Sequence, residues 1–304
     1  MDNQNADGKH PHLAPEMRPF VSVQDPSLTP DLDEMRRVAI EGKRQWNERQ
    51  YPTLSIERGS VDGAVGPRPM LDVRPPAERD TPIVHIHGGG WAMCDLDTHR
   101  AVLAEIALTT GMRVLAPHAR RAPESPYPAP LDDTISAIRD IAERLGRSVF
   151  LSGDSAGANL ALAAALRCRD EGRPLPVRAM SLFFGCYRRV FDTPSHRAYG
   201  DGRAGLSTAK MRHFWALYAP NEAPYADLSD AGFQDLPPVQ VQIAEVDALA
   251  DDSRWLAEAV QSAGGTAEVV TWPGMAHGFL HYPPDLKQIG EAYRAMKRFL
   301  EASG

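Results

Sequence analysis

The sequence predicts an α/β fold in which a mostly parallel, buried β-sheet is flanked by helices. From residue 53 onward, short apolar runs are separated by turn residues, and amphipathic stretches lie between them. Strands that alternate with helices of about 10 to 15 residues form right-handed βαβ units, which build a parallel sheet covered on both faces. Strands are expected at residues 82–86, 112–116, 148–151, 180–184, 239–244 and 267–271, and helices at residues 31–50, 99–109, 129–144, 156–170, 251–263 and 285–302.

Local signals support these elements one by one. The helix at 31–50 starts at a polar residue, Asp31 or a residue such as Thr29, and Pro52 lies just beyond its end. Polar caps and a following proline are typical of helix boundaries. The strands that read PIVHI, SVFL and MSLFF are short and apolar, as buried strands are. The less regular segment 187–235 is a candidate part of a cap over the sheet.

Composition and charge exclude several classes of protein. The chain has 304 residues, of which 43% are hydrophobic and 24% charged, so it is neither disordered nor fibrous. Lys and Arg number 33 against 40 Asp and Glu, which gives a net charge of −7. Because this balance leaves no basic excess to neutralise phosphates, we expect no nucleic-acid partner. No run of 18 apolar residues occurs, so no membrane span is expected.

The N-terminus and the cysteines predict a cytoplasmic protein. The first twenty residues are polar and lack the apolar core of a secretory signal. The three cysteines, Cys94, Cys168 and Cys186, are widely spaced and odd in number. They fit reduced thiols rather than a disulfide framework or a CxxC zinc site.

The most specific motif is G-D-S-A-G at residues 153–157, which follows the apolar run 149–151 and precedes an Ala- and Leu-rich helix. Strand, G-x-S-x-G turn and helix are the context of a nucleophile elbow, in which two glycines permit a turn that a Cβ would block. The alternative is a glycine turn merely capped by serine. The flanking strand and helix favour Ser155 as a nucleophile.

A glycine loop, HGGGW at residues 87–91, follows the strand at 82–86. Glycines leave backbone N–H groups uncovered, and acyl-transfer enzymes use such donors to hold an oxyanion. We expect Gly89, Gly90 and Ala156 to supply them. A phosphate-binding loop is disfavoured because no G-x-x-x-x-G-K-[ST] pattern is present.

A metal site in this region is also disfavoured. His85 and His87 stand two residues apart and could face one side of a strand as ligands. No third ligand is evident in the sequence. We therefore expect neither a metal nor a cofactor.

The serine needs a base and an acid that follow it in the chain. His277 is the favoured base because turn residues on both sides place it on a loop after the last strand, with His281 as the other candidate. Asp247 is the favoured acid at the end of the preceding strand, with Glu245 as the alternative. The acid would orient the imidazole and stabilise its cation.

Several motifs in the same order resemble the hormone-sensitive-lipase-like branch of the α/β-hydrolases, which includes bacterial carboxylesterases and acetyl-hydrolases. They cover roughly residues 80–300 and comprise HGGGW at 87–91, APESPYPAPLDD at 122–133, GDSAGANLA at 153–161, LPPVQVQIAEVDALADD at 236–252 and HGF at 277–279. Three details depart from the family pattern: Ala119-Arg120-Arg121 before APE, the region of Cys94-Asp95, and Ala158 in place of a glycine.

This resemblance implies an α/β-hydrolase fold with an eight-stranded, mostly parallel sheet and a helical cap. Residues 1–50 would form the N-terminal cap segment and residues 51–304 the catalytic domain, with a second cap portion around 187–235. The implied triad is Ser155, Asp247 and His277, with a structural role for Glu124 near the active-site loops. Family members are often dimers, so a homodimer is one expectation.

The expected activity is hydrolysis of short-chain acyl esters, acetyl to butyryl, through an acyl-enzyme, with a small-molecule ester as the partner. The alternatives are an amidase or N-deacetylase, a pathway-specific hydrolase with the same triad, and a non-catalytic receptor, which the presence of His277 argues against. Substrate-pocket candidates are Trp91, Met93, Phe183 and Phe184. Four arginines after the strand at 180–184 are either a site for an anionic substrate or a solvated surface: Arg188, Arg189, Arg197 and Arg203.

Overall fold

The computed structural model describes residues 8–25, 31–283 and 285–304 and contains one eight-stranded sheet. The strands are β1 (Ser55–Gly63), β2 (Gly66–Arg74), β3 (Arg79–Ile86), β4 (Met112–Pro117), β5 (Val149–Asp154), β6 (Val177–Phe183), β7 (Val239–Val246) and β8 (Ala267–Ala276). Their order is β1-β2-β4-β3-β5-β6-β7-β8. Strand β2 is antiparallel to β1 and β4, and β3 to β8 are parallel.

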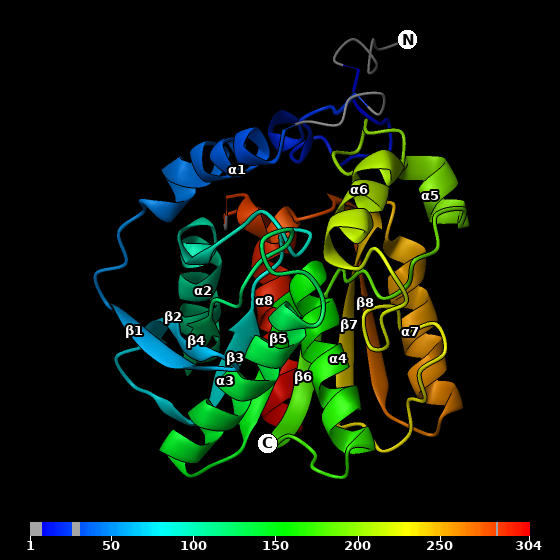
Figure 1. Cartoon of the computed structure of the whole chain (residues 1–304). Helices are drawn as coiled ribbons and strands as arrows, with labels where there is room; N and C mark the ends of the chain where they lie inside the picture. Colours follow the sequence, from blue (N-terminus) through cyan, green and yellow to red (C-terminus); the bar gives the residue numbers. More distant parts are fainter. Residues whose placement is uncertain (1–7, 26–30, 284) are drawn as a thin grey trace.

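Helices cover both faces of the sheet (Figure 1). They are α1 (Leu32–Asn47), α2 (Leu96–Thr110), α3 (Ala129–Leu145), α4 (Ala156–Asp170), α5 (Pro194–Tyr199), α6 (Thr208–Tyr218), α7 (Ala250–Ser262) and α8 (Lys287–Ala302), with 3-10 turns η1 (Arg18–Phe20) and η2 (Phe279–His281). One core cluster contains α3, α4 and α7, and the other contains α2 and α8. Helices α1 and α6 lie above one end of the sheet (Figure 1).

The predicted fold class is confirmed, and each predicted strand and helix is present; α4 has the predicted boundaries and those of the other elements are shifted. The largest strand extension is in β8, which continues through Trp272 and Pro273 because the apolar residues after them are buried. Helix α1 ends at Asn47 rather than at residue 50. Asp31 caps it by accepting the backbone N–H groups of residues 33 and 34. Thr29 lies outside the described residues.

The antiparallel hairpin of β1 and β2 has no counterpart among the predicted elements. Most of β1 is exposed, and its sequence SIERGSVDG is polar. An edge strand of this kind shows no apolar run, because its stability comes from pairing along its whole length with β2. Strand β2 contains two prolines, Pro67 and Pro69, which are uncommon within strands, so its sequence is more typical of a loop.

Helix α1 is attached by Arg36 to loops at the end of the sheet that it covers. The guanidinium of Arg36 contacts Glu124 with N–O distances of 2.6 and 2.9 Å and donates through Nε to the carbonyl of Ala92. The hydrogen bond from Arg36 lowers the pKa of Glu124 to about 2. The N-terminal segment therefore lies against the loop that follows the HGGG motif. Among the described residues, no helix is both long and apolar enough to cross a membrane.

Candidate active site

The turn between β5 and α4 presents Ser155 in a backbone conformation that few side chains adopt. Ser155 has φ 51° and ψ −121° and immediately precedes the first residue of α4. A Cβ on Gly157 would lie 2.0 Å from the carbonyl oxygen of Ile86, and one on Gly153 would lie 2.6 Å from the carbonyl oxygen of Gly157. The two glycines are therefore required for the close approach of β5, α4 and β3. The strained serine is directed out of the turn at a helix N-terminus.

Ser155, His277 and Asp247 form a row of hydrogen bonds. His277 Nε2 lies 2.9 Å from Ser155 Oγ, and His277 Nδ1 lies 2.8 Å from Asp247 Oδ2. Because a carboxylate only accepts, Nδ1 carries the proton and Nε2 accepts from the serine hydroxyl. Asp247 is buried, and its other oxygen accepts the backbone N–H of Leu249 at 3.0 Å.

The two alternatives for base and acid lie elsewhere. His281, on η2, directs Nε2 toward Asp154 at 3.6 Å rather than toward Ser155. Glu245, near the end of β7, accepts the backbone N–H of Gly274 at 2.8 Å and so connects β7 to β8. Neither contacts the serine hydroxyl.

The glycine loop borders the same cavity as Ser155 and His277. Gly89 has φ +115° and Gly90 has φ +59°, and added Cβ atoms would lie 2.6 Å from the Cys94 nitrogen and 2.4 Å from the Phe214 ring, respectively. Within the described part of the chain, the N–H groups of Gly89 and Gly90 donate to no acceptor. Ala156 opens α4, where first-turn N–H groups lack an intrahelical partner.

The active-site cavity is small, about 90 Å³. Of the four predicted pocket residues, Phe184 lines it and lies edge-to-face against His277, with ring centroids 5.1 Å apart. Trp91 and Met93 instead border a neighbouring cavity of about 20 Å³, where Ala156 also lies. Phe183, the last residue of β6, is fully buried and does not line this cavity. We therefore retain Phe184 alone of the four for the substrate pocket.

Comparisons with known proteins show the family of the chain. A sequence model of the family described as alpha/beta hydrolase fold matches residues 83–281. The chain belongs to the α/β-hydrolase family. An acetyl-hydrolase of Streptomyces hygroscopicus is 32% identical over 280 residues, covering 89% of this chain and 90% of that protein. An acetyl esterase of Salmonella agona is 29% identical over 307 residues, with 95% and 94% covered.

Solved structures support the same assignment. An esterase from the bacterial hormone-sensitive lipase family superposes on this α/β-hydrolase with a TM-score of 0.83 and 29% identity, covering 91% of this chain and 93% of that one. A Pyrobaculum calidifontis esterase superposes with a TM-score of 0.86 and 27% identity, with 95% and 98% covered. The resemblance to the hormone-sensitive-lipase-like branch is thereby confirmed.

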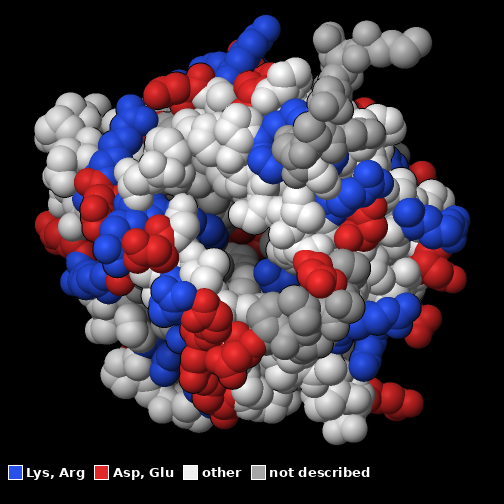
Figure 2. Space-filling model, turned by 90° about the horizontal axis from the view of Figure 1, so that it is seen from above, with Lys and Arg blue, Asp and Glu red and all other residues white. Residues whose placement is uncertain are grey.

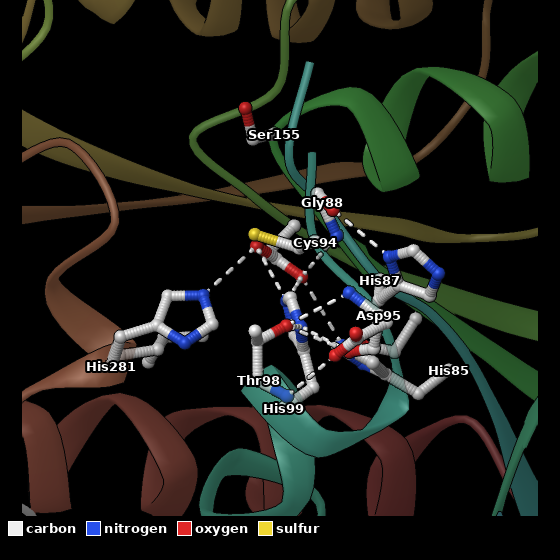
Figure 3. Close-up of polar contacts among 12 residues, drawn as sticks. His85, His87, Gly88, Cys94, Asp95, Thr98, His99, Ser155 and His281 are labelled. Atoms are coloured by element: carbon white, nitrogen blue, oxygen red, sulfur yellow. Dashed lines mark hydrogen bonds and ion pairs between the residues drawn. The ribbon is translucent and has the colours of Figure 1, made fainter. Parts of the chain in front are cut away.

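Below Ser155, the hydrolase holds a carboxylate surrounded by histidines (Figure 3). Asp154 Oδ1 accepts the backbone N–H of Gly88 at 3.0 Å and lies 3.3 Å from His85 Nε2 and 3.2 Å from His99 Nε2. Burial alone would raise the pKa of Asp154, but the neighbouring imidazoles outweigh it and hold that pKa well below its ordinary value. Asp154 thus fastens the glycine loop to the nucleophile turn.

Two histidines and one aspartate of this network are residue types that bind metal ions in proteins. His99, Asp154 and His281 place one ligand atom each within 4.8 Å of one another. Burial lowers the pKa of His99 to about 3 and that of His281 to about 4, so both imidazoles are neutral at pH 7. His85 contacts the same carboxylate, whereas His87 faces His118, with 2.8 Å between their nitrogens. The expectation of no metal stays a prediction.

Several cavity-lining residues of the hydrolase were not identified from the sequence. Lys43 comes from α1 and Cys94 from the loop before α2. Neither could be identified as a cavity residue, because local sequence does not distinguish such a lysine from others on an amphipathic helix, or such a cysteine from any lone cysteine. The remaining members come from the segment already suspected of cap function, and their aromatic and apolar content was the available signal: Leu206, Met211 and Phe214.

The four arginines after β6 do not form one anion site. Arg188 pairs with Asp252 at 2.9 Å, and Arg203 pairs with Asp201 at 2.6 Å. Arg189 donates to the carbonyl of Ala219, and Arg197 bonds the carbonyl of Asp192. None of the four lines the cavity that contains Ser155. The hypothesis that they bind substrate together is therefore wrong, because each is engaged by a separate local acceptor.

We expect replacement of Arg188 by Met to destabilise the hydrolase by about 3 to 5 kcal/mol at neutral pH. Its partner Asp252 is only 2% exposed, and burial raises the pKa of Asp252 to about 6 despite the guanidinium. Because Arg188 lowers that pKa, its loss raises it further, so at pH 7 the variant must bury an unpaired carboxylate or bind a proton, and either costs stability. Urea unfolding at pH 7 and pH 5 measures the effect.

The loss of stability in the Arg188→Met variant should depend on pH in a defined direction. A carboxyl whose pKa is raised by folding takes up a proton on folding, so its contribution is fully present below the ordinary value of 3.8 and is lost as the pH rises through about 6. The variant's deficit should therefore shrink at pH 5. Arg203→Met, which breaks a half-exposed pair, should cost less than about 1 kcal/mol. An equal Arg188→Met deficit at both pH values would contradict the assignment.

Proposed function

We propose that this carboxylic ester hydrolase is a serine esterase that cleaves short-chain acyl esters, acetyl to butyryl, through an acyl-enzyme at Ser155. The observation that carries the proposal is the continuous row from Ser155 Oγ through His277 to Asp247. A serine hydroxyl is a weak nucleophile unless a positioned base takes its proton. Here the base is already within hydrogen-bonding distance and has the correct tautomer.

In the first half of the reaction, Ser155 Oγ attacks the ester carbonyl carbon while His277 Nε2 takes the hydroxyl proton. The imidazolium that forms is stabilised by Asp247, and it then protonates the departing alcohol. In the second half, His277 takes a proton from water, which attacks the acyl-enzyme and releases the acid. Ser155 recovers its proton from His277.

The glycine loop supplies the electrostatic part of this mechanism. The N–H groups of Gly89 and Gly90 have no internal acceptor within the described residues, and together with Ala156 they are proposed to hold the oxyanion. Donors fixed before the reaction cost no reorganisation when charge develops, and each typically contributes about 10² to 10³ in kcat. Asp154, through its bond to Gly88, keeps this loop in place.

The preference for short acyl groups rests on the size of the site. The cavity of about 90 Å³ has the volume of only a few water molecules, each of which occupies about 30 Å³ in the liquid. Leu206, Met211 and Phe214 close it from the side of α6. The acetyl esterase of Salmonella and the acetyl-hydrolase of Streptomyces carry names consistent with the same preference.

Covalent labelling with a fluorophosphonate tests the proposal. We expect one adduct per chain, located on the peptide that contains Ser155, because the probe reacts with a base-activated serine. His277→Ala should abolish labelling although the serine remains. A folded wild-type protein that fails to react would support the receptor alternative. Paired acetyl ester and acetyl amide substrates then distinguish an esterase from an amidase.

A further inference from the structure

We propose that the active-site cavity receives an ester that carries a carboxylate group, which binds between the ammonium groups of Lys43 and Lys210. This inference rests on the proposed function, because it names the class of ester that the same cavity takes. It assigns to these two lysines the anion-binding role that the arginines after β6 do not have.

Lys43 reaches into the cavity from the N-terminal helix. It lines the same cavity as Ser155 and His277, although it belongs to α1, far away in sequence. Its Nζ lies 3.6 Å from Cys94 Sγ, a residue of the loop that packs against Gly89. The ammonium therefore lies on the side of the cavity formed by the glycine loop.

Lys210 approaches the same place from α6. Its Nζ lies 5.8 Å from the ring centroid of Phe214, a cavity residue on the next turn of the helix. Burial lowers the pKa of Lys210, the Cys94 thiol acts in the opposite direction, and the charge of Lys43 lowers it further. Lys210 therefore lies beside the cavity wall at Phe214.

Among the described residues, neither lysine has a counter-ion. In the portions of the chain covered by the structure, no carboxylate lies within the 4.0 Å ion-pair distance of Lys43 or Lys210, whereas Arg36, Arg120 and Arg188 all have one. Withdrawing an unpaired ammonium from water is unfavourable, and an incoming anion offsets that cost. Two such groups beside a nucleophile are a binding site for negative charge.

Asp154, the carboxylate that lines the cavity, does not act as the counter-ion of either lysine. Asp154 is engaged by the N–H of Gly88 and by the surrounding imidazoles, below Ser155. The positive charge of Lys43 also acts on the histidines around Asp154, because it lowers the pKa values of His99 and His281. Figure 2 shows the face seen from above, with a central hollow that has basic and acidic side chains at its margin. With about 90 Å³ available, a small carboxylate is the anion that fits.

The first experiment measures inhibition of 4-nitrophenyl acetate hydrolysis by butyrate and by butyramide, which have nearly the same shape and differ in charge. We expect butyrate to bind about tenfold more tightly in the wild type, as for a charge-assisted contact. Lys43→Met and Lys210→Met, which keep an unbranched side chain, should each reduce this ratio about threefold or more. Lys297→Met, near the C-terminal end of α8, should leave it unchanged.

The second experiment uses a substrate pair, acetoxyacetate and its neutral analogue acetoxyacetamide, with release of acetate as the readout. The ratio of their kcat/KM values should fall in both lysine variants and stay constant in Lys297→Met. It should also fall as ionic strength rises, because salt screens the attraction.

The outcomes separate the two proposals. If 4-nitrophenyl acetate is hydrolysed and Ser155 is labelled, but butyrate binds no better than butyramide, the lysine site is refuted and the esterase stands. The same holds if both ratios are identical in the wild type and the two lysine variants. If Ser155 neither reacts with a fluorophosphonate nor turns over 4-nitrophenyl acetate, the proposed function itself fails.

Discussion

Replacing Ser155 by alanine should lower kcat for 4-nitrophenyl acetate by about 10⁶-fold, the scale seen when a serine hydrolase loses its nucleophile. No acyl-enzyme can form without Oγ, and His277 is left with no hydroxyl to deprotonate. Fold stability should change little, since the substitution removes one oxygen from a strained turn residue. Steady-state kinetics together with a thermal unfolding curve check both statements.

The control for this variant is a serine outside the site. Ser229 is exposed, and its hydroxyl bonds Asp227 on the surface. Ser229→Ala should retain wild-type kcat and wild-type labelling. Residual turnover above about one thousandth of wild type in a contamination-free Ser155→Ala preparation would require another nucleophile and would overturn the mechanism.

Replacing Asp247 by asparagine should lower kcat by about 10⁴-fold, because it reverses the tautomer of His277. One oxygen of Asp247 accepts the N–H of Leu249, and the other accepts from His277 Nδ1. In the variant, the side-chain carbonyl is drawn to Leu249, and the amide NH₂ then faces Nδ1. The ring proton moves to Nε2, which can no longer accept from Ser155.

The matched control is Glu245→Gln, which changes the alternative acid on the same strand end. Glu245 accepts a backbone N–H of Gly274, and a glutamine oxygen can do the same. We expect less than about a tenfold change in kcat for this variant. Equal losses in Glu245→Gln and Asp247→Asn would mean that the carboxylates act through folding rather than through the imidazole. Unfolding curves for both variants provide the comparison.

Much of this architecture could be predicted from local sequence, because each βαβ unit contains the residues that specify its own strand, turn and helix. The apolar run of β5, the two glycines around Ser155 and the Ala-rich α4 specify the nucleophile turn without reference to the rest of the chain. The β1–β2 hairpin could not be predicted in this way. Its polar strands gain their structure by pairing with each other and, through β2, with β4.

The same distinction holds for the site. The sequence could propose both Asp247 and Glu245 as acids, since each follows or ends a strand, but only the packing of β7 against β8 directs Glu245 to Gly274. Likewise, Phe183 and Phe184 both belong to one buried core cluster, yet only Phe184 also lines the cavity. The backbone after the strand decided this, because Phe184 follows the end of β6 with a φ of 37° and so leaves the alternation of the strand.

By itself, the sequence determined the fold class and the order and types of the reactive groups, because turns, strands and helix starts are short-range features. The tertiary structure alone decided which side chains surround those groups. Lys43 and Phe214 line the cavity of Ser155 from helices above the sheet, whereas Arg188 is paired with Asp252 outside that cavity. Such choices depend on contacts between residues far apart in the chain, and burial and charge pairing, rather than local pattern, determine them.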